Sequence, residues 1–300
     1  MLRLRTAAAV TSVCAVAACS SPATVQSVPS RPPGATATAR ATASPVARPR
    51  PAPARVTITR ARMGDGAVVT LATFTGPVTY VLHDGSEDPG RAVEGSGRVK
   101  AGPAVRGAER GRLLAAFNGG FKLSAGAGGY EQEGHLAAAL RRGLTSLVID
   151  RSGRARIGIW GHGVPAPGEA TYSVRQNLPP LVLHGKPTKA AADWGLWGST
   201  LGGGEYVARS ALGQDAAGDL VYAASMSATP ADLASVLAYA GAQIAMELDI
   251  NPEWVQLDVA RRPGGPLRAA IHGQNRPANQ FLLGWARDFI TVLAPAGAGG

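Results

Sequence analysis

Two carboxylates, Glu247 and Asp249, lie two residues apart in an otherwise apolar run, residues 242–252. In an extended strand this spacing places both side chains on the same face. Two like charges on one side of an apolar segment are unfavourable, so their presence suggests a specific role. Paired carboxylates are the groups from which glycoside-cleaving sites are commonly built. The spacing therefore makes Asp249 the first and Glu247 the second candidate catalytic residue.

A cation lies in a second strand-like segment, where Arg209 is surrounded by small residues of the stretch 207–213. A buried guanidinium needs a carboxylate or phosphate partner. Arg209 is therefore a third candidate catalytic residue, suited to neutralising a phosphate by bidentate hydrogen bonding. The alternative is a structural ion pair in which Arg209 and Asp249 link neighbouring strands.

Two further segments offer groups that suit a sugar. Asn118-Gly119-Gly120-Phe121 follows a short apolar strand, and its glycines permit close backbone approach or a positive φ; a plain turn is the alternative. Trp194 and Trp197 lie in a glycine-rich stretch, where an indole can stack on a sugar ring. Simple packing is an equally good account of these two tryptophans.

The elements that must position these groups are mostly strands. A helix is predicted over 230–239, because Thr229-Pro230-Ala231-Asp232 supplies a hydroxyl cap, a first-turn proline and a carboxylate, and Gly241 ends it. Apolar or alternating runs predict the following strands: 56–59, 66–75, 78–82, 113–117, 144–149, 155–160, 206–212, 220–224 and 289–293. This pattern predicts an α+β fold, a strand-rich mixed sheet with a few packed helices in a single domain.

The N-terminus has the features of a signal peptide. Arg3 and Arg5 precede an apolar stretch, residues 7–18, that is too short to span a bilayer. The sequence Val16-Ala17-Ala18-Cys19 resembles the bacterial lipobox, which predicts lipidation of Cys19 and anchoring at the outer face of the cell membrane. Cleavage after Ala15-Val16-Ala17 is the alternative. Cys14 and Cys19 are the chain's two cysteines, so the mature protein is expected to contain no disulfide.

Composition divides the rest of the chain. We expect a lipoprotein signal peptide at 1–18, a disordered Pro/Ala/Ser/Thr/Arg tether at 19–54 and the folded domain at 55–300. The net charge is +10, but residues 1–54 contain six arginines and no acid, which leaves 24 basic and 20 acidic residues beyond them. No nucleic-acid-binding motif accompanies that modest excess, so a nucleic-acid partner is not expected.

Taken in order, three segments resemble the phosphodiester glycosidase family over roughly residues 56–294. Its members have an Asn-Gly-Gly-Phe segment, an Arg-Thr/Ser-Ala-x-Gly strand, a hairpin, a helix and then Leu-Asp-Gly-Gly-Gly-Ser. Residues 118–121, 209–213 and 248–249 match in this order. Ile250-Asn251-Pro252-Glu253 replaces the glycine loop, and Ala224-Ser225-Met226 replaces an Asp-Gly-Arg, so the chain resembles a divergent, actinobacterial-type lipoprotein member.

The resemblance implies hydrolysis of a sugar-phosphodiester bond in an envelope or extracellular glycan. It implies substrate binding by Asn118, Gly119, Gly120 and Ser210. Asn251, at the end of the strand-like run that carries Glu247 and Asp249, is a further candidate substrate-binding residue. The alternative is a catalytically silent lipoprotein that binds cell-wall glycan, and a purely structural envelope protein is a third possibility. No cofactor is expected, although the carboxylates and Asn251 are suitable Ca²⁺ ligands without a recognisable calcium loop.

Overall fold

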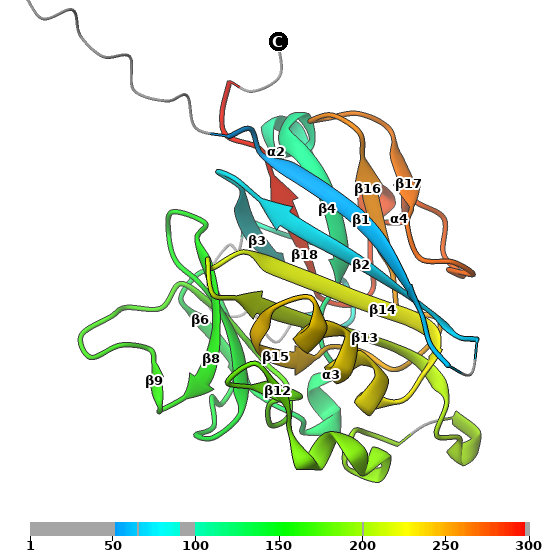
Figure 1. Ribbon diagram of the computed structural model, residues 1–300. Helices are drawn as coiled ribbons and strands as arrows, with labels where there is room; N and C mark the ends of the chain where they lie inside the picture. Colours follow the sequence, from blue (N-terminus) through cyan, green and yellow to red (C-terminus); the bar gives the residue numbers. More distant parts are fainter. Residues whose placement is uncertain (1–51, 65, 91–99, 200, 298–300) are drawn as a thin grey trace, which may run out of the picture. The chain divides into compact units, whose positions relative to one another are not determined.

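In the computed structural model, residues 52–297 are described, apart from 65, 91–99 and 200. The predicted signal peptide, Cys19 and the tether up to residue 51 lie outside the described residues. Within the described part, the strands form three sheets (Figure 1). Apart from the short parallel pair β8–β9, their neighbouring strands are antiparallel.

The first sheet has seven strands. In spatial order these are β1 (Arg55–Arg62), β2 (Val68–Thr75), β14 (Leu220–Ala228), β13 (Val207–Asp215), β15 (Ala242–Glu247), β11 (Val182–Leu183) and β12 (Lys186–Pro187). Helix α3 (Pro230–Tyr239) covers one face of this sheet (Figure 1). Its Leu233, Val236 and Leu237 pack with Ala211 and Ala245 from that face.

The second sheet consists of β6 (His135–Ala138), β5 (Tyr130–Gln132), β10 (Ser173–Gln176), β7 (Thr145–Ile149), β8 (Ala155–Trp160) and β9 (Gly163–Val164). The third consists of β17 (Leu267–Ala269), β16 (Leu257–Ala260), β4 (Leu113–Asn118), β18 (Phe289–Leu293) and β3 (Thr79–His83). Short helical turns complete the described chain: α2 (Gly107–Arg112), α4 (Gln280–Leu283), η1 (Leu123–Ala125), η2 (Lys189–Ala192), η3 (Trp194–Leu196) and η4 (Leu201–Gly203).

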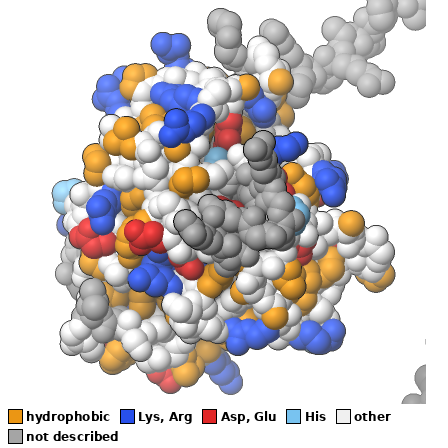
Figure 2. All heavy atoms as spheres, turned by 180° about the vertical axis from the view of Figure 1, so that it is seen from behind, with side chains coloured by type: hydrophobic (Ala, Val, Ile, Leu, Met, Phe, Trp, Pro, Cys, Tyr) orange, Lys and Arg blue, Asp and Glu red, His pale blue; other side chains and the backbone are white. Residues whose placement is uncertain are grey.

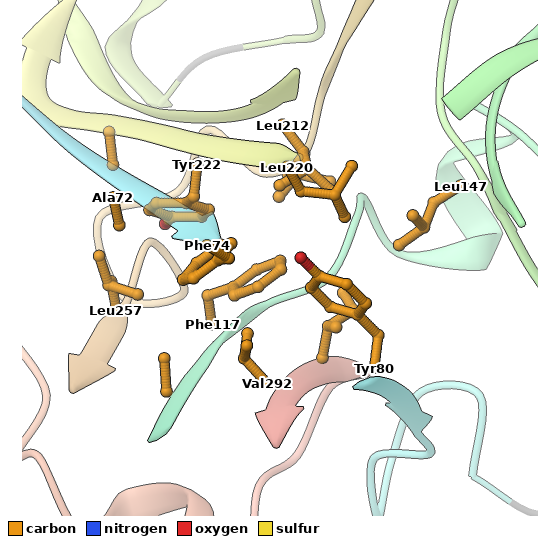
Figure 3. Close-up of a cluster of buried hydrophobic side chains, with 14 of the residues drawn as sticks. Ala72, Phe74, Tyr80, Phe117, Leu147, Leu212, Leu220, Tyr222, Leu257 and Val292 are labelled. Carbon is orange, nitrogen blue, oxygen red and sulfur yellow. The ribbon is translucent and has the colours of Figure 1, made fainter. Parts of the chain in front are cut away.

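All three sheets contribute to one buried core. Phe74 and Tyr222 of the first sheet meet Phe117 of the third, and the rings of Phe74 and Phe117 stack with centroids 5.6 Å apart (Figure 3). Leu147 of the second sheet belongs to the same cluster. Burial of these large apolar side chains is the main source of stability for the assembled sheets.

Helix α3 forms as its sequence predicts. The Thr229 hydroxyl accepts a hydrogen bond from the Asp232 amide (3.1 Å), and the Asp232 carboxylate accepts one from the Thr229 amide (2.9 Å). This reciprocal capping satisfies two amides that the first helical turn leaves without helical partners. Gly241 follows with φ +95°, a conformation that favours glycine.

The prediction of a strand-rich fold with a few packed helices is confirmed for the described chain, and each predicted strand is present within a few residues of its expected bounds. The strands are divided among three sheets, however, rather than forming one mixed sheet. Figure 2 shows Lys and Arg side chains in separate groups across the pictured face, with acidic and apolar side chains between them.

Candidate active site

The candidate residues of β13 and β15 lie at the end of the region in which these two strands pair. Ala211 lies opposite Glu247 in the register of the two strands. The pairing continues past the end of β15, because the Leu248 amide donates to the Ser210 carbonyl (2.8 Å) and the Ser210 amide donates to the Asp249 carbonyl (2.9 Å). Ser210 therefore lies directly beside Asp249.

Glu247 and Arg209 form a fully buried ion pair, with 2.8 Å between Oε1 and Nη1 and no exposure of either side chain. Arg209 also donates to the carbonyls of Ala228 (3.1 Å) and Trp197 (3.3 Å). Burial raises the pKa of Glu247 to about 8, against the opposing effect of Arg209. The sequence left open an ion pair between Arg209 and Asp249; the carboxylate that Arg209 contacts is instead Glu247.

Asp249 pairs with a cation that the sequence analysis did not select. Its Oδ2 lies 2.9 Å from Nη2 of Arg287, a residue just before β18. Its Oδ1 accepts hydrogen bonds from the amides of Ile250 (2.8 Å) and Asn251 (2.9 Å). Burial raises the pKa of Asp249 to about 6, although Arg287 and the two amides favour the ionised form.

Asp249 and Arg287 both line a cavity of about 650 Å³. The other lining residues are Phe121, Lys122, Ser124, Ala125, Gly126, Ala127, Leu178, Gly195, Leu196, Gly198, Ser199, Ile250 and Asn251. Among these described residues, Asp249 carries the only carboxylate, while Arg287 and Lys122 carry positive charge. Glu247 and Arg209 do not reach the cavity wall.

Asn118 and Ser210 lie behind this wall. The side-chain nitrogen Nδ2 of Asn118 donates to Ser210 Oγ (2.9 Å). The side-chain oxygen Oδ1 of Asn118 accepts from Tyr222 Oη (2.7 Å) and from the backbone amide of Gln256 (3.1 Å). Ser210 Oγ in turn accepts from the Asp249 amide (3.1 Å). In this structure the two side chains hold the backbone of Asp249 in place, and neither lines the cavity.

The two glycines after Asn118 make room for a second buried ion pair. Arg175 of β10 binds Asp288 through Nε (2.8 Å) and Nη2 (3.2 Å), and both side chains are 1% exposed. A Cβ added to Gly119 would lie 1.8 Å from Asp288 Oδ2, and one added to Gly120 would lie 2.8 Å from the Arg175 guanidinium. The sequence predicted either close backbone approach or a positive φ for these glycines, and the structure shows close approach.

Gly120 connects this pair to the cavity. Its carbonyl accepts a hydrogen bond from Arg287 Nη2 (2.8 Å), the same nitrogen that contacts Asp249. Arg175, Arg287 and Asp288 were not among the residues predicted from the sequence. Arg175 lies in β10, a four-residue strand that is too short to give a periodic signal in the sequence.

The two tryptophans occupy different surroundings. Trp197 is 1% exposed, packs in the core beneath α3 and donates from Nε1 to the Ala190 carbonyl (2.8 Å). Trp194 is half-buried, and its neighbours Gly195 and Leu196 line the cavity in its place. Asn251 does line the cavity, while its Oδ1 accepts from the Glu253 amide (2.9 Å).

Two negative findings apply to the described residues. No group of three or more His, Cys, Asp and Glu side chains has an arrangement that suits a metal ion. No helix in the part of the chain that the structure covers is both long and apolar enough to cross a bilayer.

Neither a protein-family model nor a curated protein matches the chain in sequence. Its structure is similar to that of the zebrafish N-acetylglucosamine-1-phosphodiester alpha-N-acetylglucosaminidase catalytic domain, auto-inhibited by its pro-peptide. The TM-score is 0.50 at 14% identity, over 81% of this chain and 83% of that one. The likeness is one of fold.

Two other solved structures resemble the chain less. A hypothetical protein from Synechocystis has a TM-score of 0.48 at 13% identity, over 81% of this chain and 62% of that one. A putative exported protein from Burkholderia pseudomallei has a TM-score of 0.27 at 14% identity, over 80% of this chain and 58% of that one.

Proposed function

We propose that this protein hydrolyses a sugar-phosphodiester bond in an envelope or extracellular glycan, with residues 55–300 acting as one α+β catalytic domain. The observation that carries the proposal is the cavity that presents the Asp249 carboxylate beside the Arg287 guanidinium. A carboxylate next to a cation suits a substrate that has both a sugar and a phosphate. The fold shared with a phosphodiester glycosidase domain is consistent with this chemistry.

The reaction has modest requirements. The bond between the anomeric carbon and the phosphate oxygen breaks, and the phosphate monoester leaves with the electron pair. Because a phosphate ester is a good leaving group, strong general-acid help is dispensable. The site must neutralise phosphate charge, and Arg287 with the exposed Lys122 supplies two cations at the cavity.

Asp249 supplies the remaining function. Its carboxylate stabilises the oxocarbenium-like centre, or it accepts the proton of the water that adds to the anomeric carbon. Glu247 and Arg209 then act indirectly, by linking β13 to the end of β15 two residues before Asp249. Asn118 and Ser210 position the Asp249 backbone through their hydrogen bonds.

The chain is proposed to work as a lipoprotein held at the outer face of the cell membrane through Cys19. Its partners would be a glycan or sugar-phosphate substrate and the membrane, with no nucleic acid. No cofactor is needed for the steps above. These statements rest on the sequence features of residues 1–54 and on the chemistry of the cavity.

One observation favours a second function, glycan binding without turnover. A glycine loop can present its backbone amides to a phosphate. In this chain the amides of Ile250 and Asn251, at the corresponding positions, both donate to Asp249 Oδ1. In addition, glycoside hydrolysis commonly uses two carboxylates, and Glu247 is buried behind the cavity.

The deciding experiment compares the wild-type protein with Asp249→Asn on a panel of sugar-1-phosphodiesters. We expect wild type to release sugar and the variant to lose at least a hundredfold in rate, because Asn neither accepts a proton nor stabilises a cation as a carboxylate does. Circular dichroism of both proteins controls for folding. Glycan binding without release by either protein would establish the binding function, and wild-type rates in the variant would remove Asp249 from the mechanism.

A further inference from the structure

A second cavity, of about 330 Å³, adjoins the first. The two share Ser199, Ile250 and Asn251 as lining residues, so they lie on opposite sides of the same short wall. The remaining lining of the second cavity is Val207, Ala208, Met226 and Pro252. None of these described lining residues is charged.

Two acceptors of Asn251 in the shared wall are occupied by amides of the residues that follow it. Asn251 Oδ1 accepts from the Glu253 amide (2.9 Å), and the Asn251 carbonyl accepts from the amides of Trp254 (2.8 Å) and Val255 (3.0 Å). Five of the seven lining residues of the second cavity are apolar, and Ser199 and Asn251 are the two polar ones, so the cavity favours a ligand group that is mainly apolar.

The wall is also held in a fixed position. A Cβ added to Gly198 would lie 2.8 Å from Ile250 Cδ1 and 2.9 Å from two carbons of the Phe121 ring. Ile250 and Phe121 are thus packed closely against the Gly198 backbone. The part of the partition formed by Ile250 therefore belongs to the packed structure, whereas Ser199 is exposed.

We propose that the second cavity binds an alkyl or prenyl chain esterified to the phosphate of the substrate. The sugar and phosphate occupy the first cavity beside Asp249, Arg287 and Lys122, and the apolar chain of the leaving phosphate monoester extends past Ile250 into the second. Ile250 and Pro252 supply part of this apolar lining. The inference rests on the proposed function and narrows its substrate class to lipid-linked sugar phosphates.

Binding of simple alkyl phosphates tests the inference without any need for turnover. Methyl, butyl and octyl phosphate are titrated calorimetrically into the full-length protein. Each fully buried methylene is expected to tighten binding by up to about fourfold, until the cavity is filled. Octyl phosphate should therefore bind at least tenfold more tightly than methyl phosphate.

Two matched variants locate the effect. Met226→Gln places an amide in the second cavity and should remove most of the dependence on chain length, while leaving the affinity for methyl phosphate within about twofold. Met63→Gln changes a partly buried methionine that lines neither cavity, and it should retain the full dependence.

The outcomes separate this inference from the proposed function. Equal affinity for the three phosphates, or an unchanged chain-length dependence in Met226→Gln, overturns the inference even if sugar phosphodiesters are hydrolysed. A chain-length dependence that Met226→Gln abolishes supports the lipid-binding cavity even if no hydrolysis is found.

Discussion

At the scale of single residues, the proposed chemistry depends on the charge of Asp249. Its partners are Arg287 and two backbone amides, and each of them favours the ionised carboxylate. Burial has the larger, opposite effect and brings the pKa to about 6. The group is therefore ionised at neutral pH but close enough to titration for mild acid to protonate it.

This pKa predicts the pH dependence of the proposed reaction. Because the ionised carboxylate is the active form, kcat/KM should be low below pH 5, rise through about pH 6 and level off above pH 7. The measurement is the initial rate of sugar release between pH 4 and 8, with protein stability checked at each pH. A rate that increases as the pH falls through 6 would mean that the protonated form is active.

A comparison of two acidic residues shows how burial decides the energetic role of an ion pair. Asp288 binds Arg175 with two hydrogen bonds, and both side chains are almost fully buried. Glu253 binds Arg276 at 2.9 Å, but these side chains are 50% and 36% exposed. Removing one partner leaves an uncompensated buried charge in the first case and a solvated charge in the second.

We therefore predict that Asp288→Asn lowers the free energy of unfolding by about 3–5 kcal/mol, whereas Glu253→Gln lowers it by about 0–1 kcal/mol. Urea denaturation at pH 7 measures both values. Similar losses in the two variants would contradict a special structural role for the buried pair.

At the scale of elements, Gly119 and Gly120 connect the end of β4 to the cavity. Gly119 donates its amide to the Asp288 carbonyl (2.9 Å), and the Gly120 carbonyl accepts from Arg287. The segment thus contacts the residues on both sides of the Arg287–Asp288 peptide bond. A side chain at Gly119 would separate these contacts.

Gly119→Ala is expected to destabilise the protein by at least about 1–3 kcal/mol, the usual cost of overpacking a well-packed interior. The added Cβ would meet Asp288 Oδ2 at 1.8 Å, so the ion pair with Arg175 must shift. Gly102→Ala is the control, because a Cβ at that position has no neighbour within 4 Å. Thermal unfolding of the two variants compares them, and equal melting temperatures would contradict the expected collision.

At the scale of the whole described domain, the cavity lies where the three sheets contribute neighbouring loops. Its lining comes from the segment after β4 of the third sheet, Leu178 after β10 of the second and Asp249 after β15 of the first. Arg287 enters from the residues just before β18. No single sheet could assemble this site.

The predicted lipidation of Cys19 is testable in cells. If Cys19 is lipidated, the protein should fractionate with membranes in a bacterial host that processes lipoproteins, and Cys19→Ala should abolish that association. Fractionation and the mass of the mature N-terminus measure the two states. A wild-type N-terminus at Ala18 without lipid would instead support ordinary signal cleavage.

The sequence by itself determined the longer local elements and two residues that line the candidate site, Asp249 and Asn251. Capping residues and apolar periodicity identify α3 and the long strands, because those signals act within a few residues. The two-residue spacing of the carboxylates selected Asp249, which lines the cavity. The short strands β5, β6, β10, β11, β12, β16 and β17 contain two to four residues each, too few for a periodic signal, and they were not predicted.

Only the tertiary structure decided which charges meet. Arg175 and Asp288 are 113 residues apart, and Asp249 takes its cation from the segment before β18. It also decided that Glu247 and Arg209 contact each other in the interior and that Trp197 packs in the core. Partner choice depends on the register of strands and the packing of sheets, and these long-range contacts leave no mark in the local sequence.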